Sequence, residues 1–476
     1  MLRLIVICAI LLSAATVRCE TPWPLRTPAE LKALHGPTFT GMQILTYRRS
    51  QEPKVDGAPP QIVIGIGQDI IYREDGQHRR IVDLRLGRIY DVQGARYVDT
   101  PIAPEIVFRE NELGNRLFLS KGMAAAGIQR DKLGVMGDPF WRGVDLKLTQ
   151  ADEPPPDLKS RVESGETVFL YDDVEVVRWR PADNALPAPQ AGNLARALLW
   201  FFQVHPSLIA GLAKDGKPPQ HFAVHSQSPN TPQSEDYQLV SSEWCATCQA
   251  LPANAQPGLF VGGVLENEMA PVMIAAAQGK FNAVSSEEYL RRMDAALDRD
   301  APLEAFLWFM ERLLQYGGRK CQPTEADDYC RIQLRLKAQG QSNGDVRIFV
   351  QGSSGKSMES ANVVANLRSK VGDNAYYIDL ASVNAIPPSA IWFKSVDTEP
   401  LKSAEKRMAI ALAGMPVVPA VYRDIGNMYF NAMNVQRAWL VWEMGKAIPG
   451  RSIEPNLWAH VDATEAKARQ RHPEFF

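Results

Sequence analysis

The chain has 476 residues, a length that suggests two to four domains of ordinary size. Hydrophobic residues make up 45 % and charged residues 22 %, which excludes a wholly disordered or collagen-like chain. The 52 basic residues are balanced by 54 acidic residues, so the formal net charge is −2. This balance argues against a protein that coats nucleic acid by neutralising its phosphates.

The first twenty residues have the layout of a secretory signal peptide. A short basic start, Met1-Leu2-Arg3, is followed by the apolar run Leu4–Ala15 and then by polar sequence. This run is too short to cross a bilayer, which takes about 20 apolar residues. Small residues permit cleavage after Ala15 or after Cys19, and we take residues 1–19 as the signal peptide. No later segment could span a bilayer, so we expect a periplasmic or secreted protein.

Residues 20–190 predict a β-rich domain with one long helix. Between Thr38 and Ile102, short strand-like runs are separated by turns that contain Gly and Asp, such as YREDGQH and VQGA, which is typical of hairpins. Residues 104–126 predict a helix, because a proline stands near its start and apolar residues recur at helical spacing. Strand patterns return at 143–148 and 167–179. A curved antiparallel sheet wrapped on this helix is the expected arrangement.

One part of this domain is loosely similar to the half-barrels of periplasmic lipoprotein carriers. The similarity lies in the strand-rich segment IVDLRLGRIYDVQGARYVDTPI, residues 81–102. It implies a concave apolar face that binds acyl chains or peptides. The alternative is a sheet whose inner face is simply filled by the predicted helix.

Four cysteines follow Cys19, and an even number in an oxidising compartment favours disulfides. Three pairings are possible. We favour Cys321 with Cys330, which closes the polar loop CQPTEADDYC, and Cys245 with Cys248. The second pair lies in residues 191–284, which predict a helical and loop-rich connecting region.

Two chemical alternatives involve the same cysteines. Trp244-Cys245-Ala246-Thr247-Cys248 resembles the redox motif of thioredoxin-type proteins, but the Pro- and Gly-rich LPANAQPG after it does not predict the helix that this family places there. His221 and His225, four residues apart, offer a zinc site together with Cys245 and Cys248. A structural disulfide is the interpretation that we favour.

A phosphate-binding loop is suggested between residues 345 and 370. Residues 345–351 (DVRIFVQ) predict a strand, GSSGKS follows, and 360–370 predict a helix. Val350 stands where the nucleotide-binding pattern needs its first glycine. We therefore expect a flexible turn rather than a nucleotide site.

Residues 285–476 predict a helical domain, so the fold class is α+β. Short helical patterns follow one another in series, which is typical of repeat solenoids. They lie at 286–314, 360–370, 403–413, 421–430, 435–446 and 454–470.

Residues 419–452 resemble one tetratricopeptide repeat, a unit of 34 residues. The positions that this family keeps large or small in a fixed order are occupied by Tyr422, Ile425, Gly426, Tyr429, Ala438, Trp442 and Gly445. The two small residues Gly426 and Ala438 let paired helices approach closely, while the aromatic residues fill the groove between and behind them. A partial copy precedes this repeat, and a degenerate copy spans 286–319.

The resemblance implies a binding surface on the first helix of the repeat, where ligands of this family, usually peptides, bind. In this chain that surface carries Arg423, Asn427, Phe430 and Asn431. Arg423, Asn427 and Asn431 form a polar line one helical turn apart, which suits a carboxylate or a peptide backbone.

No motif identifies a reaction: the chain has no His-Glu-x-x-His, no Gly-x-Ser-x-Gly and no EF-hand loop. We expect no cofactor. The main hypothesis is an exported, non-enzymatic protein that binds a protein or peptide through its helical repeats. The first alternative is a periplasmic carrier that binds a lipid or another apolar ligand in the β-rich domain. The second is a thiol redox or zinc enzyme at Cys245 and Cys248.

Overall fold

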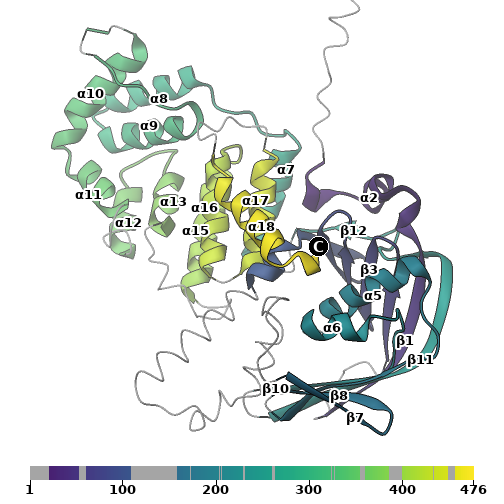
Figure 1. Cartoon of the computed structure of the whole chain (residues 1–476). Helices are drawn as coiled ribbons and strands as arrows, with labels where there is room; N and C mark the ends of the chain where they lie inside the picture. Colours follow the sequence, from purple (N-terminus) through teal and green to yellow (C-terminus); the bar gives the residue numbers. More distant parts are fainter. Residues whose placement is uncertain are drawn as a thin grey trace, which may run out of the picture.

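The computed structural model contains a β-rich part and a helical part that contact each other (Figure 1). It describes residues 21–52, 61–108, 158–171, 173–202, 204, 206–228, 231–259, 263–322, 324–325, 327–353, 360–384, 399–432, 434–448 and 456–476. The predicted signal peptide, most of the predicted helix 104–126 and the predicted strand 143–148 therefore lie outside the described residues. The predicted α+β fold class is confirmed.

The described strands form one sheet of 12 strands in the order β12-β6-β5-β4-β3-β2-β1-β11-β10-β9-β8-β7. Neighbouring strands are antiparallel, except that the short β12 is parallel to β6. The bounds are β1 Thr40–Glu52, β2 Gln61–Ile66, β3 Ile70–Asp75, β4 His78–Asp83, β5 Arg88–Gln93, β6 Arg96–Pro101, β7 Leu158–Glu163, β8 Glu166–Tyr171, β9 Val174–Pro181, β10 Pro219–Ser228, β11 Thr231–Gln249 and β12 Gln256–Pro257.

Tight glycine turns join the strands of the first half of the sheet. Gly76 (φ 63°) lies between β3 and β4, and Gly94 (φ 59°) lies between β5 and β6. Each turn has two residues between paired strand ends, a geometry that needs a positive φ. Glycine adopts this φ without the steric cost that a side chain imposes. The hairpins predicted between Thr38 and Ile102 are present.

The region 191–284 differs from its prediction as a helical and loop-rich connection. Residues 219–249 instead add β10 and the 19-residue β11 to the sheet, and β11 pairs along almost the whole of β1. Along β11, side chains from Val240 to Thr247 are exposed or half-buried, with Trp244 54 % exposed. Because neither face of this stretch is fully buried, its sequence lacks the period-2 alternation that predicts a strand.

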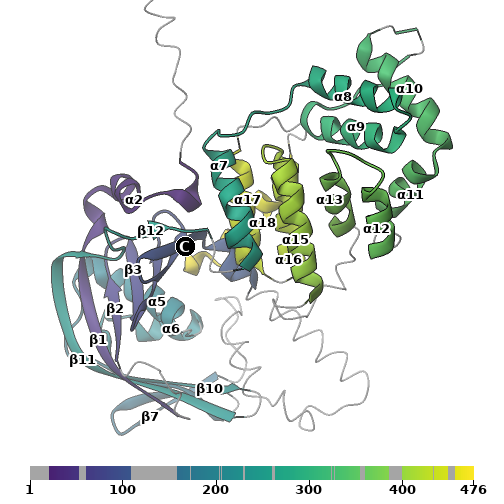
Figure 2. The ribbon, with the colours of Figure 1, turned by 180° about the vertical axis from the view of Figure 1, so that it is seen from behind.

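The concave face of the sheet is filled by α5 (Ala188–Phe201) and α6 (Pro206–Leu212) (Figures 1 and 2). Leu194 and Leu198 of α5 belong to one buried cluster with Tyr47 and Ile64 of the sheet. Residues 103–108 begin the predicted helix, and Ile106 joins the same cluster. Among the described residues, the inner face is thus occupied by the protein's own side chains, and more of them come from α5 and α6 than from the described start of the predicted helix.

The helical part is a series of short helices that pack on their neighbours (Figure 2). None of the described helices combines the length and the apolar character that a membrane crossing requires. The helical part begins with the π-helical turn η4 Leu265–Met269. It continues with α7 Ala270–Ala277, α8 Ser286–Asp298, α9 Pro302–Tyr316, α10 Asp328–Ser342, α11 Gly344–Ser353, α12 Ala361–Arg368, α13 Tyr376–Asn384, α15 Glu399–Gly414, α16 Pro419–Asn431, α17 Val435–Lys446 and α18 Ala459–Arg471.

The segment that resembles a tetratricopeptide repeat forms a helical hairpin of α16 and α17. A Cβ atom on Gly426 would lie 2.0 Å from Nε1 of Trp442, and one on Gly445 would lie 2.5 Å from Cβ of Tyr422. Glycine at these two positions therefore sets the distance between the helices. The other five positions of the repeat pattern are all buried: Tyr422, Ile425, Tyr429, Ala438 and Trp442.

The C-terminal segment ties the helical part to the sheet. The 3-10 turn η6 (Pro473–Phe475) follows α18, and the C-terminus lies between the two parts in both views (Figures 1 and 2). Phe475 is 1 % exposed, and its ring centroid lies 5.2 Å from that of Trp200 in α5. Nε1 of Trp200 donates a hydrogen bond to the Phe475 carbonyl oxygen (3.2 Å).

A buried charge cluster adds to this junction. The Arg88 guanidinium of β5 donates from Nη2 to Oε2 of Glu443 in α17 (2.9 Å) and from Nε to Oδ1 of Asp99 (2.7 Å). Burial raises the pKa of Asp99 to about 7, although the neighbouring Arg88 opposes this rise. The cluster shares one cation between two carboxylates that come from the two parts of the chain.

We expect Gly426→Ala to destabilise the protein by about 1–3 kcal/mol, because the added methyl group overlaps the Trp442 indole. The matched control is Gly192→Ala in α5, where a Cβ atom would meet nothing within 4 Å. It should stabilise the protein by about 0.5–1 kcal/mol through helix propensity. Urea unfolding measures both changes, and equal stability of the two variants would contradict the close approach of α16 and α17.

Candidate functional site

A cavity of about 600 Å³ lies between α9, α10 and α11, and we call it the α9–α11 pocket. This volume falls in the range of about 300–1,000 Å³ that is typical of small-molecule sites. Its apolar lining side chains come from all three helices and are Phe306, Phe309, Leu334, Leu336, Val346 and Val350. Most of them are only half-buried or exposed, so the helices do not close on one another here.

Three cationic side chains also line the α9–α11 pocket: Lys320, Lys337 and Arg347. All three are exposed, and none of them forms an ion pair with another described residue. The sequence explains this for the two helical residues, because no acidic residue stands three or four positions from Lys337 or Arg347. By contrast, Arg331 and Arg335 on the same α10 pair with Asp294.

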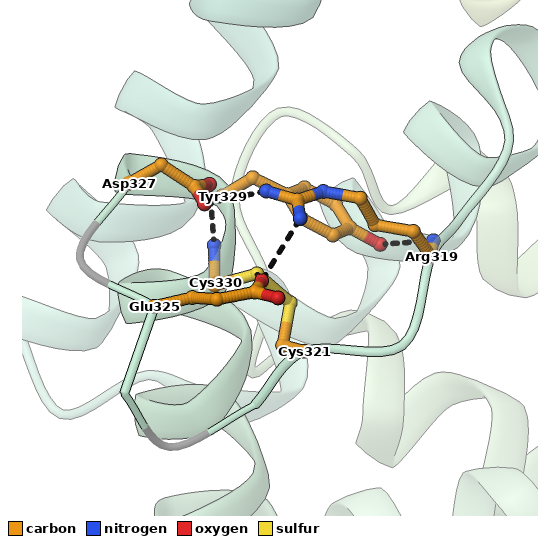
Figure 3. Close-up of a disulfide and its surroundings, with 6 residues drawn as sticks. All are labelled: Arg319, Cys321, Glu325, Asp327, Tyr329 and Cys330. Carbon is orange, nitrogen blue, oxygen red and sulfur yellow. Dashed lines mark hydrogen bonds and ion pairs between the residues drawn. A yellow bond between two sulfur atoms is a disulfide. The ribbon is translucent and has the colours of Figure 1, made fainter.

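One wall of the α9–α11 pocket is fixed by the Cys321–Cys330 disulfide (Figure 3). Cys330 lies in the first turn of α10, where its backbone N–H donates to the capping Asp327 carboxylate (3.1 Å). The Arg319 guanidinium reaches both Asp327 and Glu325 across the same loop (Figure 3). In the chain-entropy model, closing a loop of this size stabilises the fold by about 2–3 kcal/mol.

The two disulfides are those favoured from the sequence, Cys245–Cys248 and Cys321–Cys330. The ligand atoms of Cys321, Glu325 and Cys330 lie within 4.8 Å of one another, a spacing that a metal ion could bridge. However, the two sulfurs are bonded to each other, and only a thiolate is a good metal ligand. This group therefore does not make a metal site while the disulfide is intact.

The predicted zinc alternative is not supported by the strand register. His221 lies opposite Gln238 on β11, whereas Cys245 lies seven residues further along the same strand. At about 3.4 Å per residue, this separation is about 20 Å or more, and zinc ligands lie about 2 Å from the ion. Each of the two histidines instead lies beside a carboxylate. Nδ1 of His221 is 2.7 Å from Oε1 of Glu166, and Nε2 of His225 is 3.0 Å from Oε1 of Glu175.

His221 on β10 contacts a carboxylate on β8 and another on β11 through its two ring nitrogens. Its Nε2 lies 2.7 Å from Oδ2 of Asp236, in addition to the contact with Glu166. Burial favours the neutral ring, but the hydrogen bonds to the two carboxylates outweigh it and raise the pKa of His221. This arrangement is that of a strand-bridging ion pair.

The residues predicted to bind a peptide lie on α16, but not all of them face the same way. Arg423, Asn427 and Asn431 follow one another at one-turn spacing and are half-buried. Arg423 pairs with the adjacent Asp424 (Nε–Oδ1 2.9 Å). Phe430 instead packs on α17, with its ring centroid 5.8 Å from that of Trp442. The polar line is therefore present, and Phe430 belongs to the packing of the hairpin.

The sequence did not predict the α9–α11 pocket, because it predicts a strand for the segment that forms one wall of the pocket. Residues 345–351 predict a strand before a glycine turn, but they lie in α11. The run DVRIFVQ is rich in β-branched residues, yet packing of Val346 and Phe349 into the helical core decides its conformation. Two signals pointed to the site: the disulfide loop and the cations without acidic neighbours.

Glu311 holds α9 to the helices on either side of it. Its carboxylate accepts hydrogen bonds from the hydroxyl groups of Tyr289 in α8 (2.6 Å) and Tyr376 in α13 (2.7 Å). Glu311 is 2 % exposed, and this burial raises its pKa to about 7, although the two tyrosines lower it. The charged form is thus costly in the folded protein.

We expect stability to fall as the pH rises from about 4.5 to above 7, because the unfolded chain releases the Glu311 proton at its ordinary pKa and the folded chain keeps it. The contribution of Glu311 to this loss should be on the order of 3 kcal/mol. Glu311→Gln should remove the contribution of Glu311 to this loss, so that the variant gains stability over wild type between pH 5 and pH 8, while the contribution of Asp99 remains. Glu268→Gln on an exposed position is the control. Parallel pH profiles of urea unfolding for both variants would contradict the role of Glu311.

No family model matches the chain, and no curated protein matches it. The chain is weakly similar to a solved structure that concerns lipid–protein interactions in lipovitellin, with a TM-score of 0.14 and 10 % sequence identity. The match covers 89 % of this chain and 57 % of the lipovitellin chain, so this chain spans little more than half the length of that protein. A similarity at this level carries no argument about fold or function.

Proposed function

We propose that this protein is an exported, non-enzymatic binding protein that holds the apolar part of a lipid-like ligand in the α9–α11 pocket. The observation that carries the proposal is the cavity of about 600 Å³ whose lining includes six apolar side chains from three helices. Burying a ligand's methylene groups against such walls contributes about 0.8 kcal/mol for each group. A concave apolar site with a few polar groups at its edge is the usual form of a small-molecule site.

The β-rich part is a less suitable place for such a ligand. The resemblance to half-barrel carriers implied an open concave face, but α5, α6 and Phe475 bury that face within the protein's own core. Binding there would require these elements to leave. The proposal therefore keeps the carrier hypothesis and places the ligand in the helical part.

The disulfides support action outside the cytosol. Such bonds persist in oxidising compartments such as the periplasm and the extracellular space. Two disulfides in this chain, together with the signal peptide expected at residues 1–19, favour a periplasmic or secreted location.

The binding test uses the neutral fluorescent probe N-phenyl-1-naphthylamine with the full mature chain. We expect about one probe per chain, with binding weakened about tenfold or more by Val350→Trp. Val350 lines the pocket and is 45 % exposed, so the indole fills the cavity without entering the core. Val162→Trp on β7, at a side chain that is 75 % exposed, is the control. If Val350→Trp binds the probe as wild type does, the pocket is not the binding site.

A second candidate function is peptide binding through the repeat-like hairpin. The half-buried polar line Arg423, Asn427 and Asn431 favours it, because side chains at one-turn spacing can hold a C-terminal carboxylate or a peptide backbone.

The test of this second candidate compares a peptide library that has free C-terminal carboxylates with the same library after amidation. We expect the free carboxylates to bind more tightly, and Arg423→Ala combined with Asn427→Ala to weaken that binding about tenfold. Arg291→Ala combined with Gln470→Ala, at exposed positions elsewhere, is the control. Unchanged binding by the α16 variant would exclude this surface.

A further inference from the structure

The charge around the α9–α11 pocket has one sign. Lys320, Lys337 and Arg347 line the pocket, while none of its described lining residues is acidic. The three cations come from three separate segments: the loop after α9, the helix α10 and the helix α11. They converge on one cavity because the tertiary packing of these segments brings them together.

The nearest acidic residues in the sequence do not neutralise this charge. Glu325 and Asp327 are held by Arg319, and Asp345 is held by Lys370 at 2.6 Å. The surrounding acids are thus already paired with other cations. Low-dielectric apolar walls beside unpaired cations concentrate a positive potential at the pocket mouth.

The three cations at the edge of the pocket favour an anionic group on the ligand. Lysine and arginine form charge-assisted hydrogen bonds with carboxylate and phosphate oxygens, and arginine does so with two parallel N–H groups. Gln322, Gln333 and Gln341 also line the pocket and add amide groups that donate to an anion. The apolar walls below this edge suit a hydrocarbon chain.

We infer that the ligand of the α9–α11 pocket is a single-chain anionic amphiphile, whose chain lies against the apolar walls and whose carboxylate or phosphate head group lies among Lys320, Lys337 and Arg347. This inference rests on the proposed function, since it specifies the ligand of the same pocket. One chain is specified because a cavity of about 600 Å³ is that of one small-molecule ligand.

The test displaces N-phenyl-1-naphthylamine from the full mature chain with three ligands of equal chain length: dodecanoic acid, dodecyl phosphate and dodecanol. We expect the acid, the phosphate or both to bind about tenfold more tightly than the alcohol, and this preference to shrink in 0.5 M salt. The stronger of the two anions identifies the head group.

Lys320→Gln combined with Lys337→Gln should reduce the preference to less than about threefold, because it weakens binding of the anions more than binding of dodecanol. Lys280→Gln combined with Lys467→Gln removes the same charge from exposed positions elsewhere and should keep the full preference.

Two negative outcomes are distinguishable. If dodecanol binds wild type as tightly as both anions do, the inference is wrong and the proposed apolar site stands. If neither the probe nor any of the three ligands binds, the proposed function fails, and the inference fails with it.

Discussion

The burial of the sheet's concave face is the constraint on which the rest of the structure depends. Among the described residues, α5 supplies more of the covering side chains than any other element, and Phe475 from the far end of the chain joins the same cluster. This packing stabilises the sheet and also anchors the helical part to it, because the same C-terminal segment follows α18. The ion pair of Arg88 with Glu443 sits at the same junction. With the concave face occupied in this way, open apolar surface among the described residues lies elsewhere.

One such surface lies between α9, α10 and α11, where most of the apolar lining side chains are half-buried or exposed. Glu311 and its two tyrosine partners hold α9 in place on one side, and the Cys321–Cys330 disulfide holds the loop to α10 on the other. The apolar side chains between these supports stay partly uncovered. A preorganised cavity of this kind costs little ordering entropy when a ligand binds. In the function that we propose, the cations at its edge distinguish an anionic apolar ligand from a neutral one.

Local patterns allowed much of the fold to be predicted. The glycine turns at Gly76 and Gly94 predicted hairpins, and the small residues Gly426 and Ala438 predicted a closely packed helical pair. The structure contains both, because each depends on residues that are near one another in the chain. β11 and α11 were not predicted. The side chains of β11 are partly exposed on both faces, so its sequence lacks the alternation typical of a strand, and the β-branched residues of α11 favour a strand instead of a helix. The α9–α11 pocket depends on α11 and could not be derived without it.

The sequence by itself determined the fold class, the turn positions and the disulfide pairing that we favoured, because these follow from local backbone preferences and from short loops. Only the tertiary structure decided which helix fills the sheet, that Phe475 joins the two parts, and that Lys320, Lys337 and Arg347 surround one cavity. These are contacts between segments distant in the chain, and no local periodicity encodes them. These contacts depend on which apolar faces pack against one another, and that packing involves segments from the whole chain.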